Sequence, residues 1–280
     1  MARFDRSTIR RYYDRHTGAF VSFGQGGSLG TLHRAVWGPG ATSRDEAFRY
    51  VEDRIAVVAR ELETDRPLHV LDLGCGVGAS LCYLAGRMPI VGTGLTVSPT
   101  QAEVARQLIR RSGLFDRIAV IEADYSDIPD SVPRADLAFA IESFVHAPDP
   151  ERFLGECQRL VRPDGALVIC DDFRRPTGGA GSAAAIERFR RGWHINTLIG
   201  VDELLSLADR AGFHHQRTLD LSPHLEIGRA RDRAIDVVAA VLERVPWRWP
   251  RADPWLGGSA LQTCLRKGWI GYELVVFRRR

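Results

Sequence analysis

Short apolar runs alternate with amphipathic segments along most of the chain. The amphipathic segments carry apolar residues at helical spacing, and Ser43 with Glu46 makes a capping-box pattern at the start of one of them. Parallel strands need crossover connections of this length, so the alternation predicts a mostly parallel sheet with helices on both faces. The runs predict strands at 69–73, 90–95, 119–122, 135–141, 166–171, 215–221 and 271–277, with helices at 43–61, 79–87, 98–113, 150–160 and 201–211.

Three segments do not follow this alternation of strands and helices. Residues 1–45 precede the sheet, with a helix predicted over 7–16 and a glycine-rich loop over 23–30. Two further segments follow predicted strands, which places them over the carboxyl edge of the sheet, where open α/β folds bind ligands. We therefore expect a single domain: an N-terminal helical lid (1–45), a cofactor-binding core (46–173), and a completion of the core (174–280) with lid insertions at 174–200 and 222–268.

Composition narrows the class of protein. The chain is 45% hydrophobic and 26% charged, as in soluble globular proteins. A net charge of +3 without a concentrated basic stripe does not suggest a nucleic-acid binder. Five cysteines without a Cys-x-x-Cys pair indicate reduced thiols, and no apolar run reaches the ~18 residues of a membrane span. We expect a cytoplasmic protein that is not inserted in a membrane; whether it forms a homodimer stays open.

The most informative motif is a glycine-rich turn directly after the first predicted strand. It reads Asp72-Leu-Gly74-Cys75-Gly76-Val-Gly78, and glycines there let the backbone approach a ligand and adopt positive φ. The pattern is neither the dinucleotide form nor a phosphate loop, and Asp72 before the glycines suits a ligand with cationic groups. The motif resembles the cofactor loop of class I S-adenosylmethionine-dependent methyltransferases. This resemblance implies a Rossmann-like, doubly wound, seven-stranded α/β fold and S-adenosyl-L-methionine as the cofactor.

Two later strand ends add to the same resemblance. The segment 94–99, Gly-Leu-Thr-Val-Ser-Pro, resembles a variant found in small-molecule C-methyltransferases of the tocopherol type, which implies ribose contacts from Thr96 and Gln101. The alternative is a helix-capping Ser-Pro pair, and both interpretations can hold. The third strand ends in Asp124-Tyr125, where the family accepts the adenine amino group and reads the ring with the next backbone N–H. Asp124 is otherwise a turn aspartate.

The fourth strand continues into Glu142-Ser-Phe-Val-His146-Ala-Pro. This stretch resembles sterol and prenyl-diphosphate C-methyltransferases, which methylate an alkene carbon. An alkene attacks the methyl group without prior deprotonation and leaves a carbocation, which must lose a proton to a base. The resemblance implies that Glu142 is this base and that His146 orients it or binds a headgroup. Alternatively, Glu142 binds the amino-acid end of the cofactor and His146 caps the next helix.

The expected lid segments are rich in aromatic, arginine and histidine residues. Aromatic rings can wall a pocket that shields a cation, and arginine forks suit a diphosphate. Taken singly, each is more typical of core packing or of a solvated surface. Mg²⁺ could bridge a diphosphate, but the chain has no Asp-Asp-x-x-Asp cluster and predicts no metal ligands of its own. The residues predicted to bind the substrate are Tyr12, Tyr13, His16, Arg34, Arg190, Trp193 and His194.

These patterns lead to one principal hypothesis and two alternatives. The principal one is C-methylation of an alkene carbon in an isoprenoid diphosphate of the isopentenyl, geranyl or farnesyl type, with Glu142 as base. The first alternative is a methyltransferase of a sterol, quinone or aromatic natural product, in which His146 or His194 would be the base. The second is a non-catalytic cofactor-binding protein, against which the intact glycine loop with Asp72 and Asp124 argues.

Overall fold

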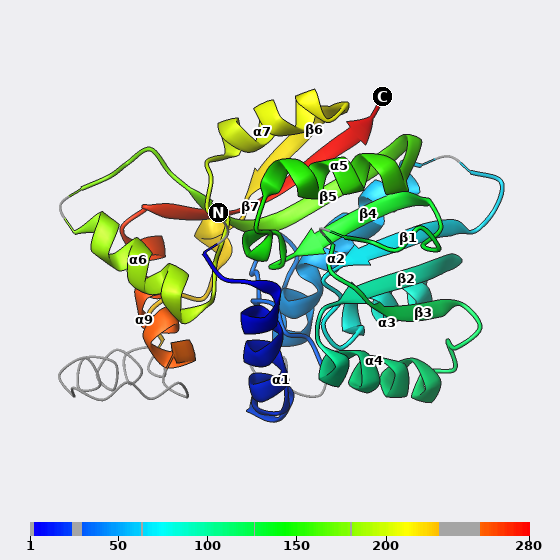
Figure 1. Cartoon of the computed structure of the whole chain (residues 1–280), viewed down its shortest axis with the longest axis horizontal. Helices are drawn as coiled ribbons and strands as arrows, with labels where there is room; N and C mark the ends of the chain where they lie inside the picture. The colour runs from blue at the N-terminus through cyan, green and yellow to red at the C-terminus, as the bar shows by residue number, and fades with distance from the viewer. Residues whose placement is uncertain (1–2, 24–29, 63, 126, 180, 230–252) are drawn as a thin grey trace.

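The computed structural model describes residues 3–23, 30–62, 64–125, 127–179, 181–229 and 253–280. Two parts of the expected lid, 24–29 and 230–252, therefore lie outside the described residues. The first of them contains most of the predicted glycine-rich loop. Figure 1 shows a twisted sheet with helices on both of its faces and a helical pair at one end.

The described residues form a seven-stranded sheet in the order β3-β2-β1-β4-β5-β7-β6. The strands β1 to β5 pair in parallel, whereas β7 is antiparallel to both β5 and β6. This arrangement confirms the predicted fold class. The strands are β1 (Leu68–Leu73), β2 (Ile90–Thr96), β3 (Ile118–Glu122), β4 (Ala135–Ile141), β5 (Val161–Arg174), β6 (Phe213–Asp220) and β7 (Ile270–Arg279).

The helices begin where the sequence provides caps. Ser43 and Glu46 form the predicted capping box of α2, and the Ser98 hydroxyl accepts the Gln101 N–H at the start of α4. The helices are α1 (Arg6–Phe23), α2 (Arg44–Arg60), α3 (Ala79–Arg87), α4 (Pro99–Arg111), α5 (Pro150–Leu160), α6 (Ser182–Gly192), α7 (Val201–Arg210) and α9 (Asp253–Arg266), with short 3-10 turns at Phe144–His146 and Ser222–His224.

Two boundaries differ from the prediction by five residues or more. The first helix continues through Thr17 and Gly18 to Phe23, well beyond the predicted 7–16, since no proline interrupts it. The fifth strand starts at Val161 rather than at residue 166, and its pairing with β4 shifts register between Ala135 and Leu137. The segment Pro163-Asp-Gly lies within this irregularity, and Asp164 there has a φ of 60°.

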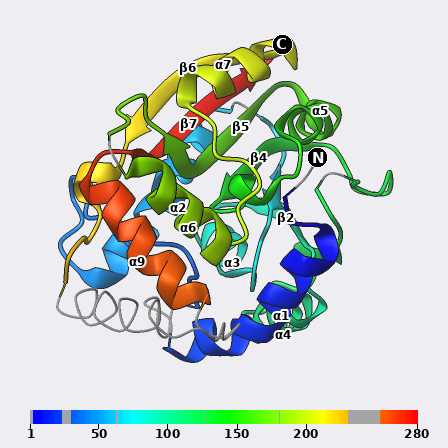
Figure 2. The same ribbon diagram turned by 60° about the vertical axis from the view of Figure 1, so that its left-hand side comes forward.

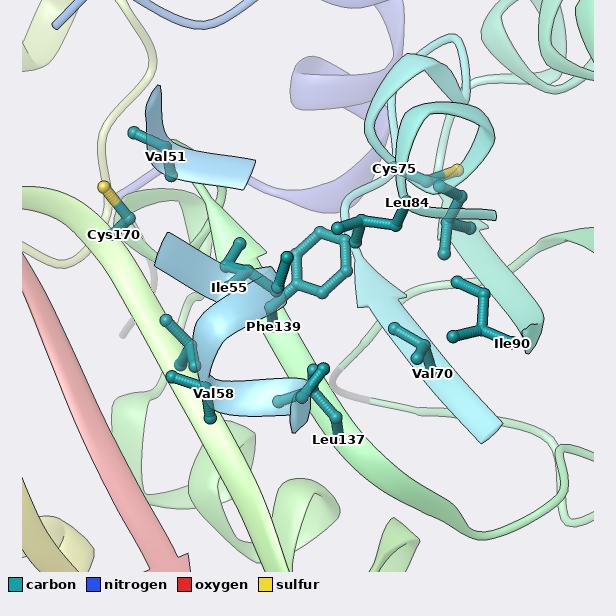
Figure 3. Packing of buried hydrophobic residues seen from close by; sticks show 14 of the residues in the cluster. Val51, Ile55, Val58, Val70, Cys75, Leu84, Ile90, Leu137, Phe139 and Cys170 are labelled. Atoms are coloured by element: carbon teal, nitrogen blue, oxygen red, sulfur yellow. The ribbon is translucent and has the colours of Figure 1, made fainter. Parts of the chain in front are cut away.

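Alternate residues of the strands point to opposite faces and build two cores. On one face α2, α3 and α4 pack on the sheet, with Val51, Ile55 and Val58 of α2 facing Leu137 and Phe139 of β4 (Figure 3). On the other face α5 and α7 pack on the intervening residues. Both layers hold the strand ends rigidly at the carboxyl edge of the sheet.

The helices outside these layers flank that edge. In Figure 2, α6 and α9 lie side by side next to the sheet, and α1 lies along α4 on the opposite side. A third apolar cluster joins α6 to α9. The segments predicted as lids thus contribute helices to the edge where the cofactor loop lies. The division of the chain into a lid (1–45), a core (46–173) and a completion of the core (174–280) stays a prediction.

Candidate active site

A cavity of about 780 Å³ opens at the carboxyl edge of the sheet. Its walls come from the ends of β1, β2, β4 and β5, the segment 30–34, and the helices α1, α6 and α9. Most residues predicted for the site line it. These are Tyr13, His16, Arg34, Asp72, Gly74, Cys75, Gly76, Thr96, Gln101, Asp124, Tyr125, Glu142, His146 and Trp193.

The glycine loop forms the floor of this cavity. Gly74 has a φ of +97°, and a Cβ built there would lie 2.4 Å from the Cβ of Ser143. Gly76 and Gly78 also have positive φ, and Gly78 packs against Ala105 of α4 instead of lining the cavity. Glycine is therefore required at position 74 by conformation and by space.

Replacing Gly74 by alanine should lower the free energy of unfolding and remove cofactor binding. A non-glycine residue in this conformation costs about 1–3 kcal/mol, and the clash with Ser143 adds to that. Urea unfolding and titration with S-adenosylhomocysteine would measure both effects. Gly86→Ala in α3, where a Cβ meets nothing within 4 Å, is the matched control. Equal behaviour of the two variants would contradict the assignment.

Asp72 lies at the end of β1 and presents a buried carboxylate to the cavity. It is 3% exposed, and no hydrogen bond or ion pair from the described residues reaches it. Burial and the neighbouring charge of Glu52 raise the pKa of Asp72 well above its usual value. A cationic group would relieve this cost, so the residue fits the amino-acid end of S-adenosylmethionine.

The ends of β2 and β3 present the other predicted cofactor residues. The Thr96 hydroxyl donates to Oε1 of Gln101 at 2.8 Å, and both side chains are buried at the cavity wall. The Tyr125 hydroxyl donates to the carbonyl of Ser143 at 2.7 Å. Asp124 lines the cavity and also closes a tight turn with Asp127. Their contacts with a nucleoside stay predictions.

Glu142 follows β4 in a left-handed conformation, with a φ of 49°. Its Oε1 accepts from the backbone N–H and Nε of Arg34, each at 2.9 Å, and from the Tyr272 hydroxyl at 3.0 Å. Burial raises the pKa of Glu142, but the charges of Arg34 and His33 outweigh burial, so the pKa lies below its ordinary value. Strained backbone of this kind is common at functional sites.

Arg34 is held by two carboxylates at once. Its Nη1 donates to Asp172 at 2.9 Å while its Nε contacts Glu142, and its guanidinium lies 4.0 Å from the centre of the Tyr272 ring. Asp171 lies beside this pair and accepts the backbone N–H groups of Val145 and Asp172. Arg34 is thus neutralised within the protein.

His146 is a neutral, oriented imidazole. Its Nδ1 lies 3.1 Å from the carbonyl oxygen of His194, which only accepts, so Nδ1 carries the proton. Nε2 is then an acceptor, and the Tyr13 hydroxyl donates to it at 2.6 Å. Burial lowers the pKa of His146 to about 4 and raises that of Tyr13.

Three residues predicted to bind the substrate do not line the cavity. Arg190 donates to the backbone carbonyl of Asn196. The ring of Tyr12 is buried and lies 4.5 Å from that of His194, which has a φ of 55°. These residues lie behind the wall: Arg190 is bonded to a backbone carbonyl, and the rings of Tyr12 and His194 pack against each other. The apolar wall is formed instead by Phe189, Trp193, Ile195, Trp255 and Leu261.

The sequence reasoning missed several residues at the cavity or directly behind it. Tyr272 lies inside an apolar strand behind the cavity wall, where nothing in the local pattern marks its hydroxyl as a donor to Glu142. His33 is one of many basic residues in the expected lid, so nothing in the sequence distinguishes it. Asp171-Asp172 at the end of a predicted strand is a visible acidic signal, but its pairing with Arg34 depends on packing between distant segments. No group of three or more His, Cys, Asp or Glu side chains suited to a metal ion occurs in the described ranges.

Comparison with known proteins decides the family. A family model described as a methyltransferase domain matches residues 71–169. Methyltransferase GfsG of Streptomyces halstedii is 32% identical over 212 residues, which cover 75% of this chain and 76% of that protein. The chain belongs to the class I S-adenosylmethionine-dependent methyltransferases.

Other relatives of this methyltransferase differ in their substrates. The 27-O-demethylrifamycin SV methyltransferase of Amycolatopsis mediterranei is 28% identical over 194 residues, covering 69% of this chain and 70% of its own. A geranyl diphosphate methyltransferase solved with geranyl diphosphate and sinefungin superposes with a TM-score of 0.73 at 19% identity, covering 98% of this chain and 99% of its own. At that identity the likeness concerns the fold alone. Among the residues the structure describes, no helix of the methyltransferase is long and apolar enough to cross a membrane.

Proposed function

We propose that this methyltransferase methylates a hydroxyl group of a largely apolar small molecule, with His146 as general base. The observation that carries the proposal is the neutral imidazole of His146, whose Nε2 is an acceptor at the cavity wall. A hydroxyl group needs a base to remove its proton as it attacks a methyl group. A buried imidazole that is neutral at physiological pH meets that requirement.

The charge of the cavity favours a neutral substrate over a diphosphate. The arginines that line it are Arg6, Arg15 and Arg34, and Arg34 is already paired with two carboxylates. A diphosphate needs cationic donors that are not already neutralised. Five carboxylic acids line the same cavity, namely Asp72, Asp124, Glu142, Asp171 and Asp172.

The mechanism uses a small number of residues. S-adenosylmethionine supplies the methyl group on a sulfonium. The acceptor hydroxyl gives its proton to Nε2 of His146, at the position that the Tyr13 hydroxyl now contacts. The carbonyl of His194 holds the ring orientation and stabilises the positive charge that forms. The apolar wall from α6 and α9 excludes water from the reacting groups.

One relative supports this reaction class. The name of the 27-O-demethylrifamycin SV methyltransferase specifies methylation at an oxygen atom. It covers more than two thirds of this chain, whereas the likeness to the geranyl diphosphate enzyme lies in the fold. We therefore propose an oxygen atom of a natural product as the acceptor.

A second candidate is the predicted C-methylation of an isoprenoid diphosphate, with Glu142 as base and Mg²⁺ bridging the phosphates. The strained backbone of Glu142 at the cavity wall favours it. The commitment of Oε1 to three donors weakens the action of Glu142 as a base. This substrate stays a prediction.

A panel of acceptors would test both candidates. The protein is incubated with S-adenosylmethionine and one of three acceptor classes: hydroxylated macrolides and aromatic polyketides, sterols and quinols, or isopentenyl and geranyl diphosphates with Mg²⁺. Mass spectrometry then detects the gain of one methylene group. We expect products from hydroxylated neutral acceptors. Products from the diphosphates alone would overturn the proposal in favour of the second candidate.

Tyr13→Phe should raise the pKa of His146 by about one unit. The Tyr13 hydroxyl donates to Nε2 and so stabilises the neutral ring, an interaction worth about 1 kcal/mol. An NMR titration of the imidazole resonance measures the shift without any substrate. Tyr83→Phe, whose hydroxyl contacts Asp53 on α2, is the control. An unchanged His146 pKa would show that this hydrogen bond does not form in solution.

A further inference from the structure

Glu52 is a fully buried carboxylate directly behind the cofactor loop. It lies on α2 and has no solvent exposure. Its Oε1 accepts from Nε2 of His33 at 2.9 Å, Nη1 of Arg49 at 3.0 Å and the Ser80 hydroxyl at 3.1 Å. Its other oxygen, Oε2, is buried and has no hydrogen-bond partner among the described residues.

These contacts join three separate segments around the cavity floor. His33 belongs to the segment 30–34, and Ser80 lies in the first turn of α3, directly after the glycine loop; both line the cavity. Each ring nitrogen of His33 faces a group that only accepts, namely the Glu52 carboxylate and the backbone carbonyl of Arg34. The ring must therefore donate at both nitrogens, which makes His33 a fixed cation.

The charges of Glu52 and His33 act on Asp72, which lines the cavity. The titratable groups that face it are Glu52 from α2, His33 from the segment 30–34 and the Cys75 thiol of the glycine loop. His33 and Arg49 compensate Glu52, whereas no cation of the described residues pairs with Asp72. Asp72 therefore lacks a cationic partner of its own, and burial together with the nearby charge of Glu52 makes its ionisation costly.

We propose that Glu52 is a positioning residue for cofactor binding. Through its hydrogen bonds it holds the segment 30–34 and the start of α3 around the amino-acid end of S-adenosylmethionine. It also leaves Asp72 without a cationic partner until the ammonium group of that cofactor binds. The bound ammonium group supplies the cationic partner that Asp72 lacks among the described residues. Glu52 acts through His33, Ser80 and Asp72 and does not itself touch the cofactor.

This arrangement couples cofactor binding to release of a proton. Burial and the charge of Glu52 raise the pKa of Asp72, and an ammonium group at the site favours the ionised carboxylate, so its binding lowers that pKa. Affinity for the cofactor should therefore rise with pH until Asp72 ionises in the free protein. A ligand without the amino-acid chain should show neither effect.

Calorimetric titration of the full chain with S-adenosylhomocysteine and with 5′-methylthioadenosine tests the proposal. The second ligand keeps the nucleoside but lacks the amino-acid end. For Glu52→Gln we expect about tenfold weaker binding of S-adenosylhomocysteine and unchanged binding of 5′-methylthioadenosine. Glu61→Gln, at the exposed end of the same helix, is the matched control and should bind both ligands normally.

Titrations of the wild-type chain at pH 6 in buffers of different ionisation enthalpy count the released protons, so the proposal is testable even if Glu52→Gln does not fold. We expect proton release with S-adenosylhomocysteine and none with 5′-methylthioadenosine. Equal affinity losses for the two ligands in Glu52→Gln, or no proton release in the wild type, would overturn the proposal. None of these readouts depends on the methyl acceptor, so failure here is distinct from failure of the proposed hydroxyl substrate.

Discussion

His146→Gln should lower kcat by a factor of about 10² to 10⁴ while leaving the affinity for S-adenosylhomocysteine unchanged. A positioned general base contributes an acceleration of this size. Glutamine can still fill the space and contact the Tyr13 hydroxyl, but its amide does not accept a proton at neutral pH. The loss should appear in turnover, because proton removal is needed in the transition state and not for cofactor binding.

The pH dependence gives a second test of the same role. The pKa of His146 lies at about 4, so the ring is neutral and able to accept a proton over the whole physiological range. Turnover at saturating cofactor and acceptor should therefore not fall through protonation of His146 until the pH approaches 4. An acid limb near the ordinary histidine value of about 6.5 would show that burial does not hold the ring neutral.

Steady-state kinetics with an acceptor from the panel would measure these effects. His215→Gln is the control, because His215 is exposed on β6 and does not line the cavity. Glu142→Gln separates the two candidate reactions. Retained turnover in His146→Gln together with its loss in Glu142→Gln would assign the base to Glu142 and favour alkene methylation.

The parts of the site that could be predicted from sequence are those fixed by strand ends. Asp72, Thr96 and Glu142 each follow an apolar run, and parallel strands bring such positions to one edge of the sheet. The local sequence pattern predicts each strand, and the parallel pairing of the strands places their carboxyl ends at one edge of the sheet. No knowledge of long-range packing is needed for this inference.

The pairing of charged side chains could not be predicted in this way. Arg34 and Arg190 look alike in the sequence, yet one lines the cavity between two carboxylates and the other binds a backbone carbonyl. The partner of a long side chain depends on how distant segments pack. Glu52 gave a weak signal, since it is a charged residue among the buried positions of α2, but its partners come from three segments.

Arg34→Met should lower the free energy of unfolding by about 3–5 kcal/mol. The substitution leaves Glu142 and Asp172 buried without their shared cation, and breaking a buried ion pair costs this amount. Above pH 5 the deficit should be largest, because the lowered pKa of Glu142 stabilises the wild type only where the carboxylate is ionised. It should shrink as the pH falls through that pKa.

Urea unfolding of Arg34→Met, Asp172→Asn and the double variant would measure the effect. The double variant should lose less than the sum of the two singles, because removing one carboxylate relieves part of the uncompensated charge. Arg210→Met, which breaks an exposed pair with Glu151, is the control and should cost below about 1 kcal/mol.

The sign of the change in stability of Arg34→Met also bears on the substrate. An arginine kept for a diphosphate would be a strained, unpaired cation whose removal raises stability, as is common for binding residues. A large loss of stability instead identifies Arg34 as the internal partner of Glu142 and Asp172, which leaves it unavailable for a phosphate and favours a neutral acceptor.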